Sequence, residues 1–277
     1  MTLPSTGALP GERRGYVAFG AGQLHYREQG EGPAIILVHQ APWASIQYRR
    51  VMPLLAAAGY RAIAPDLPGH GMSDPLADPT IEGFAAILPP LLDGLGIDHA
   101  ILIGQHGGAL VAGRMAAEYP DRALALAMDN APLYTAERRA QRLAAIDDSQ
   151  RVAPDGSHLT DRWSLVRRVA DPDWSDETLH VSVLTYFANG PTREHGHHAA
   201  ARYDFTADLG RIACPTLVIA GRTDPVYPSG RALIDRRPEW EYAELSGGAG
   251  VLLDHAATWC ATLFPFVDTH VGYQRKT

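Results

Sequence analysis

The sequence predicts an α/β fold, with a mostly parallel, twisted sheet of about eight strands and helices on both of its faces. Short runs of apolar, often β-branched residues, such as 34–39 (AIILVH) and 216–221 (TLVIAG), are typical of strands buried on both sides. Segments rich in Ala and Leu lie between these runs and have the length of helices. Because parallel strands need crossover connections, the alternation of strand and helix favours this class over an all-α or all-β fold.

The first two strands are expected at 16–19 and 23–29, where Gly20 and Gly22 between them indicate a hairpin. Later strands are expected at 34–39, 61–65, 100–104, 123–128, 216–221 and 240–245. Helices are expected near 44–58, 80–95, 107–119 and 229–236, and at the C-terminus.

The alternation stops between Pro132 and Asp208, where arginine-rich helical segments are broken by loops such as APDGSH. We expect residues 132–208 to form a helical insertion over one end of the sheet. The core would then consist of residues 1–131 and 209–277.

Composition excludes several classes of protein, among them nucleic-acid-binding, disulfide-rich and membrane-spanning proteins. The 277 residues carry a net charge of −7, and the only lysine is Lys276, so scattered arginines cannot form the basic face that nucleic acid needs. Cys214 and Cys260 are too few for a disulfide framework and lack metal-ligand spacing. No apolar run approaches a membrane span. We expect a soluble cytoplasmic protein that acts on a small molecule without nucleic acid, membrane or cofactor; its oligomeric state is open.

Ligand sites of parallel sheets lie at the carboxyl ends of the strands. The segments that follow these ends are His39-Gln40-Ala41-Pro42, Gly104-Gln105-His106-Gly107-Gly108, Asp129 and Asp224. Another distinctive segment is 66–74 (DLPGHGMSD).

From about residue 15 onward these segments resemble the α/β-hydrolase superfamily. HQAP stands where the family has its His-Gly-x-Pro oxyanion loop, and DLPGHGMSD is similar to the DxxGxGxSD stretch. Residues 109–122 (ALVAGRMAAEYPDR) resemble the helix after the nucleophile, and 214–228 (CPTLVIAGRTDPVYP) the strand and loop that carry the acid. The resemblance implies that the helical insertion is a cap.

The catalytic positions depart from the family pattern. The family elbow is G-x-S-x-G, and a gap-free count back from YPDR puts His106 on the nucleophile position. Without Ser, Cys or Asp there, neither serine-esterase chemistry nor the carboxylate attack of epoxide hydrolases and dehalogenases is expected. A count back from Asp254-His255 puts Ala249 on the position of the catalytic histidine, whether by natural change or by engineering.

A histidine on the elbow can act as a general base because it is mostly neutral at pH 7. Backbone N–H groups of Gly107 and of the Gln40–Ala41 loop would form an oxyanion hole. This pair favours deprotonation, as in elimination, C–C cleavage or cyclisation, on a small aromatic or polyketide-like carbonyl compound. Hydrolysis of an ester or lactone by water that His106 activates is the alternative, and a catalytically inactive binding protein is the second. Asp224 has the family acid position and Asp129 the alternative one, so either could orient His106.

Substrate contacts are expected from His39 and, on the cap side, from one or two of His195, His197 and His198, of which His195 and His198 are preferred. An aromatic wall is expected from Trp43, Tyr134, Trp163, Tyr186 and Phe187. For His39, as for His70, a role in loop packing is the preferred interpretation. His195 and His198 lack a further carboxylate ligand at helical spacing beyond Glu194, so no metal site is expected.

Overall fold

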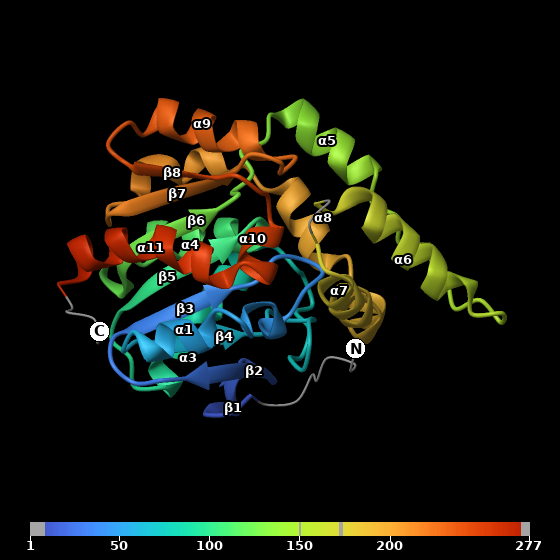
Figure 1. Ribbon diagram of the computed structural model, residues 1–277, viewed down its shortest axis with the longest axis horizontal. Helices are drawn as coiled ribbons and strands as arrows, with labels where there is room; N and C mark the ends of the chain where they lie inside the picture. The colour runs from blue at the N-terminus through green and yellow to red at the C-terminus, as the bar shows by residue number, and fades with distance from the viewer. Residues whose placement is uncertain (1–8, 150, 172–173, 273–277) are drawn as a thin grey trace.

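An eight-stranded sheet forms the centre of the molecule (Figure 1). The structure is a computed structural model and describes residues 9–149, 151–171 and 174–272. The strand order is β1-β2-β4-β3-β5-β6-β7-β8. Strand β2 pairs antiparallel with both of its neighbours, β1 and β4, and all pairs from β4 to β8 are parallel. The strands are β1 Glu12–Phe19, β2 Gly22–Gln29, β3 Ala34–Val38, β4 Arg61–Pro65, β5 Ala100–Gln105, β6 Ala123–Asp129, β7 Thr216–Gly221 and β8 Glu241–Leu245. The predicted fold class and hairpin are confirmed.

Helices cover both faces of this sheet. One face carries α1 (Met52–Ala57), α10 (Gly250–Asp254) and α11 (Ala256–Val271). The other carries α2 (Ile81–Ala86), α3 (Leu88–Gly94), α4 (Gly107–Glu118) and α9 (Tyr227–Arg236). Within β3, Ile36 packs against the face that carries α4, whereas Ile35 and Leu37 pack against the face that carries α1 and α11. Because successive side chains of a strand point to opposite faces, this central strand is apolar throughout.

Two expected helices are broken by proline. The segment expected at 44–58 contains a short 3-10 turn, η1 (Ser45–Tyr48), and then α1, with Pro53 in its first turn. The segment expected at 80–95 divides at Ile87 into α2 and α3, with Pro89 in the first turn of α3. Proline lacks an N–H and is tolerated in a first helical turn, so each proline marks a new helix start.

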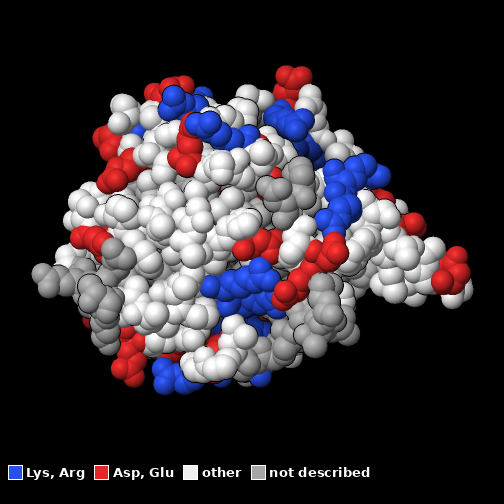
Figure 2. Space-filling view, viewed as in Figure 1, with Lys and Arg blue, Asp and Glu red and all other residues white. Residues whose placement is uncertain are grey.

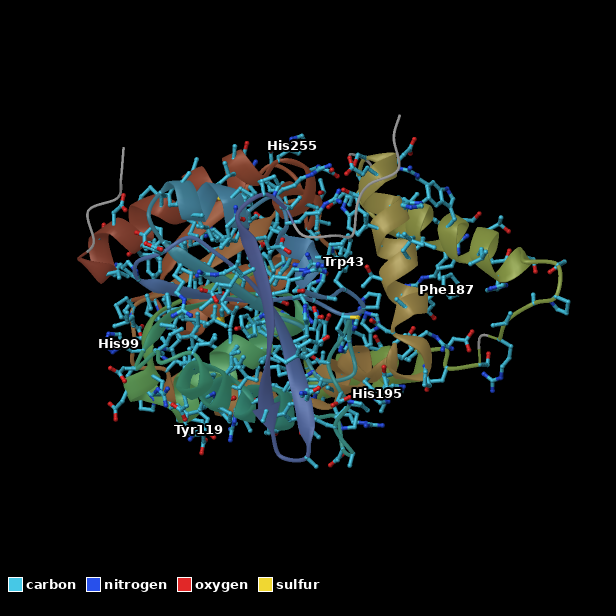
Figure 3. The ribbon with its side chains drawn as sticks, turned by 90° about the horizontal axis from the view of Figure 1, so that it is seen from below. Trp43, His99, Tyr119, Phe187, His195 and His255 are labelled. Carbon is cyan, nitrogen blue, oxygen red and sulfur yellow. The ribbon has the colours of Figure 1, made fainter. Side chains whose placement is uncertain are left out.

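The segment between β6 and β7 is helical in its described residues and lies at the carboxyl ends of the strands (Figure 1). It contains α5 (Ala136–Ala144), α6 (Ser157–Val169), α7 (Asp176–Ala188) and α8 (His195–Arg202). A short 3-10 turn, Gly190–Thr192, lies between α7 and α8, and two more, Phe205–Ala207 and Leu209–Arg211, follow α8. Another, Pro120–Arg122, precedes β6. We call α5–α8 the cap. Figure 3 shows Trp43, Phe187 and His195 at the cap end, and His99 and Tyr119 at the opposite end.

Acidic and basic side chains are interspersed on the face shown in Figure 2. Among the described residues, no helix is both long and apolar enough to cross a bilayer.

Candidate active site

His106 stands at a sharp turn between β5 and α4, with φ 48° and ψ −119°. A Cβ atom at Gly104 would lie 2.2 Å from the carbonyl oxygen of Gly108, and one at Gly108 would lie 2.1 Å from that of Val38. Only glycine fits these two positions. The G-x-H-x-G spacing therefore builds a strained strand-to-helix turn that presents the side chain of His106, as the sequence count predicts.

The imidazole of His106 is bound to the carboxylate of Asp224, with 2.8 Å between Nε2 and Oδ2. Asp224 follows β7, and its other oxygen accepts the backbone N–H of Val226 at 2.9 Å. Burial alone would lower the pKa of His106, but the charge and hydrogen bond of Asp224 outweigh it and raise that pKa. Burial opposes ionisation of Asp224 as well, yet the attraction of His106 leaves its pKa lowered. The ring nitrogen Nδ1 of His106 has no hydrogen-bond partner among the described residues.

Asp129 lies behind the elbow and does not bond the His106 ring. Its buried carboxylate accepts hydrogen bonds from the side chains of Gln105 at 2.8 Å, Trp259 at 3.0 Å and Asn130 at 2.8 Å. Burial raises the pKa of Asp129 to about 7, against the attraction of His106. Of the two candidate partners, the geometry therefore selects Asp224, and the expectation that Asp129 could orient the ring is corrected.

Ala249 lies at the start of α10 and lines the same cavity as His106. Its backbone N–H lies close enough to the Asp224 carboxylate to help lower the pKa of that group, and its carbonyl oxygen accepts from the Gln105 amide at 3.3 Å. Position 249 thus adjoins the acid, where the register of the family histidine predicts it, but its methyl group offers no base.

Two backbone N–H groups could stabilise an oxyanion. Gly107 is the first residue of α4, and neither its N–H nor that of Ala41 has an acceptor among the described residues. The N–H of Gln40 donates to Oε1 of Gln47 at 3.1 Å, so Gln40 does not supply its backbone as expected. Its side-chain Nε2 is buried without an acceptor.

A cavity of about 440 Å³ lies between the elbow and the cap. Of the expected aromatic wall, Trp43 and Tyr134 line this cavity, whereas Trp163, Tyr186 and Phe187 do not. His197, one of the three histidines from which a cap-side contact was expected, also lines it. Residues that the sequence reasoning missed line it as well: Arg142, Arg162, Leu165, Val169, Asp171, Trp174 and Ser182. The arginine-rich segments of α5 and α6 look like solvated helix faces in the sequence, so nothing there separates the arginines that face the cavity.

His39 packs the loops, as its preferred interpretation predicts, and the expected substrate contacts of His39, His195 and His198 are not found. His39 is fully buried under the oxyanion loop, where Nε2 accepts the N–H of Leu67 and Nδ1 donates to the carbonyl of Gln40, both at 2.9 Å. His195 and His198 line a separate hollow, and His198 pairs with Asp148 at 2.8 Å. Their spacing of three places both on one face of α8, while His197 faces the cavity. The described residues contain no group of three His, Cys, Asp or Glu side chains that could hold a metal.

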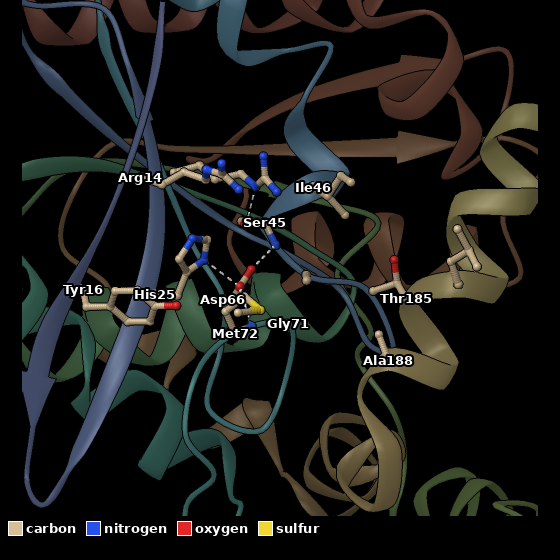
Figure 4. Close-up of a pocket in the computed structure, with 13 residues that line it drawn as sticks. Arg14, Tyr16, His25, Ser45, Ile46, Asp66, Gly71, Met72, Thr185 and Ala188 are labelled. Atoms are coloured by element: carbon tan, nitrogen blue, oxygen red, sulfur yellow. Dashed lines mark hydrogen bonds and ion pairs between the residues drawn. The ribbon is translucent and has the colours of Figure 1, made fainter. Parts of the chain in front are cut away.

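A second hollow, of about 430 Å³, lies between the β1–β2 hairpin and α7 (Figure 4). Asp66 on its floor accepts from His25 at 2.8 Å and from the N–H groups of Ser45 at 2.6 Å and Met72 at 2.9 Å. Burial would raise the pKa of Asp66, but these bonds hold it at about 2. The bonds tie the 66–74 loop to the hairpin, and the elbow residues do not line this hollow.

The fold has three layers, with helices on both faces of a mostly parallel sheet. Together with the strained turn at His106 and the carboxylate of Asp224 after β7, this architecture defines an α/β-hydrolase type of protein. The chain matches the α/β hydrolase fold family over residues 33–239 and belongs to it. It is 34% identical over 174 residues to an epoxide hydrolase from Caballeronia sordidicola, covering 62% of this chain and 51%, or about half, of that protein. It is 31% identical over 234 residues to a haloalkane dehalogenase from Mycobacterium marinum, covering 76% of this chain and 75% of that protein. A solved enol-lactonase structure from Burkholderia xenovorans LB400 has a TM-score of 0.73 and 23% identity, covering 92% of this chain and 100% of that one.

Proposed function

We propose that this protein is a hydrolase that cleaves an ester or lactone with water activated by His106. The observation that carries the proposal is the pairing of Nε2 of His106 with Asp224, which leaves Nδ1 without a protein partner at the cavity wall. Asp224 would hold the Nε2–H tautomer, so the lone pair on Nδ1 is the base.

In this mechanism Nδ1 takes a proton from water while the water oxygen attacks the substrate carbonyl carbon. The N–H groups of Ala41 and Gly107 stabilise the oxyanion that develops. When the tetrahedral intermediate collapses, the imidazolium returns the proton to the leaving alkoxide. No covalent enzyme intermediate forms, which agrees with an elbow that carries no Ser, Cys or Asp.

Deprotonation of carbon is the second candidate, since the same base and N–H pair would suit an enolate. The sequence alone favours this chemistry because a base paired with an oxyanion hole is what carbon deprotonation needs. The relatives named above as epoxide hydrolase and haloalkane dehalogenase favour hydrolysis instead. A catalytically inactive binding protein would keep the cavity and lose turnover.

A panel of 4-nitrophenyl esters and aryl lactones, run in ¹⁸O-labelled water, tests the proposal. Hydrolysis predicts ¹⁸O in the acid product and loss of turnover in His106→Gln. His99→Gln is the matched control, because His99 is exposed at the far end of the molecule (Figure 3). Carbon deprotonation would instead give hydrogen exchange with deuterated solvent and no ¹⁸O incorporation. Turnover of no member of the panel, together with ligand binding that survives His106→Gln, would favour the binding protein.

A further inference from the structure

Two arginines of the cap line the catalytic cavity, Arg142 from α5 and Arg162 from α6. Both are half-buried, and no carboxylate of the described residues lies within ion-pair distance of either guanidinium. Their helix neighbours Arg139 and Arg167, which do not line the cavity, form ion pairs with Asp204 and Asp176. Arg138 and Arg168 of the same helices also lack an ion pair with any described residue, but both are exposed to solvent outside the cavity. Arg142 and Arg162 are therefore the half-buried arginines of these helices that offer an unpaired positive charge to the cavity.

Aromatic rings hold the two guanidinium groups in place. The central carbon of the Arg162 guanidinium lies 3.5 Å from the ring centroid of Tyr186, and its Nε is buried without a hydrogen-bond partner. That of Arg142 lies 5.3 Å from the ring centroid of Tyr134, and its charge opposes protonation of His106. Stacking fixes the plane of a guanidinium while leaving its N–H groups for a ligand, so little entropy is lost when an anion binds.

The nearby carboxylates already have other partners. Asp171 accepts from the hydroxyl of Thr223 at 2.6 Å and from the N–H of Gly250 at 2.9 Å. Asp224 is bound to His106, and Glu194, behind the wall, is bound to His197 at 2.6 Å. None of them is within ion-pair distance of the two arginines.

We propose that Arg142 and Arg162 bind a carboxylate of the substrate, so that the substrate is an acidic ester or lactone. This rests on the proposed function for the bond that reacts, but the binding of the anion does not depend on catalysis. A guanidinium matches a carboxylate with two parallel hydrogen bonds, which a lone ammonium cannot supply.

The cavity also fixes the shape of this substrate. Leu165 and Val169 of α6 and Trp174 give it an apolar wall, although Leu165 is 38% and Val169 63% exposed to solvent. A volume of about 440 Å³ admits a small ligand. The substrate would place its carboxylate on the cap, its apolar body along α6 and its reacting carbonyl at the elbow.

The test compares two probes of matched shape, 3-phenylpropanoate and its neutral amide, by tryptophan fluorescence, since Trp43 and Trp174 line the cavity. We expect the wild type and His106→Gln to bind the carboxylate at least about tenfold more tightly than the amide. Arg142→Gln and Arg162→Gln should each remove most of this preference. Arg168→Gln, on an exposed arginine of α6 outside the cavity, is the matched control and should keep it.

Equal binding of the two probes by the wild-type protein, or a preference that survives in Arg142→Gln/Arg162→Gln, would overturn the inference. Arg142→Lys and Arg162→Lys keep the charge and should restore part of the preference if a glutamine variant folds poorly. A carboxylate preference that persists while His106→Gln retains full turnover would sink the proposed mechanism and leave the anion site standing. Loss of turnover in His106→Gln with no preference in any variant would do the reverse.

Discussion

One ring nitrogen of His106 is hydrogen-bonded to the protein, and the other has no partner among the described residues and is left for a ligand in the cavity. Nε2 bonds Asp224, whose side chain is 2% exposed, while the imidazole side chain is 29% exposed. This division turns an amino acid with an ordinary pKa near neutrality into an oriented base. The residue also has a positive φ, a conformation that costs of order 1–3 kcal/mol outside glycine and must be stabilised by the packing of the turn.

Removal of Asp224 should shift the pH dependence of the reaction. Burial lowers the pKa of His106, and Asp224 is the main group that raises it. In Asp224→Asn only the weaker attraction of Asp129 opposes burial and Arg142, so the pKa of the His106 imidazole falls. Because the base works when deprotonated, the acid limb of kcat/KM should move to lower pH, by about one unit or more. The measurement is a pH–rate profile, with Asp98→Asn on the surface as the control. An acid limb that stays where the wild type has it would show that Asp224 does not set this pKa.

Asp129 should reverse the usual carboxylate contribution to stability. Its folded pKa of about 7 is above the unfolded value of about 3.9, so the folded protein binds the extra proton between these values. The free energy of unfolding should then fall as pH rises through this window, with a slope of up to about 1.4 kcal/mol per pH unit from this group. Urea unfolding from pH 4.5 to 6.5 in the wild type and Asp129→Asn measures it. Equal slopes would mean that Asp129 is ionised throughout.

Site residues that belong to a sequence motif could be predicted, whereas residues that reach the site only through the tertiary fold could not. Counting from YPDR located His106, and counting from Asp254-His255 located Ala249, because insertion-free turns preserve register. The use of the Gln40 N–H by Gln47 and the placement of His197 rather than His195 depend on contacts between distant segments. Periodicity could have shown that His195 and His198 share one face, but not which face meets the cavity.

At the scale of elements, the elbow tolerates no side chain at Gly108. In Gly108→Ala the new Cβ would meet backbone 2.1 Å away, which cannot rotate aside, so β3 and α4 must separate. We expect the free energy of unfolding to fall by roughly 1–3 kcal/mol or more. Gly210→Ala is the matched control, since nothing lies within 4 Å of the added methyl there. Chemical denaturation of both variants checks this, and equal midpoints would contradict the packing argument.

Asn189, at the end of α7, joins the cap to the oxyanion loop. Its Nδ2 donates to the carbonyl of Pro42 at 2.7 Å, and its Oδ1 accepts the N–H of Gly71 at 2.9 Å. Asn189→Ala leaves the buried carbonyl of Pro42 without its partner, at a cost of about 1–3 kcal/mol, and releases the N–H of the exposed Gly71 to solvent. We expect kcat/KM to fall about tenfold because the Ala41 N–H loses its support. Asn189→Asp keeps the acceptor and loses the donor to Pro42, so it should lower kcat/KM as well. Unchanged kcat/KM in both variants would show that the oxyanion loop keeps its conformation without Asn189.

At the scale of the molecule, the sheet could be predicted because its signal is local. Each buried strand appears in the sequence as an apolar run, and the helices between the runs are the connections that parallel strands need. The helix breaks at Pro53 and Pro89 were missed because the apolar pattern continues through them. The orientation of the cap helices could not be predicted from the sequence, because the arginines that line the cavity and those that face solvent occur in the same kind of sequence segment.

The most direct test of the central claim compares two pKa values in the free enzyme. One is the pKa of His106, measured by nitrogen NMR of the imidazole, and the other is the acid-limb pKa of kcat/KM for an ester that the protein hydrolyses. If His106 is the general base, the two should coincide above the ordinary 6.5, and His106→Gln should lose about 10²- to 10⁴-fold in kcat/KM together with that limb. Near-normal hydrolysis by His106→Gln, with the acid limb unchanged, would contradict the account.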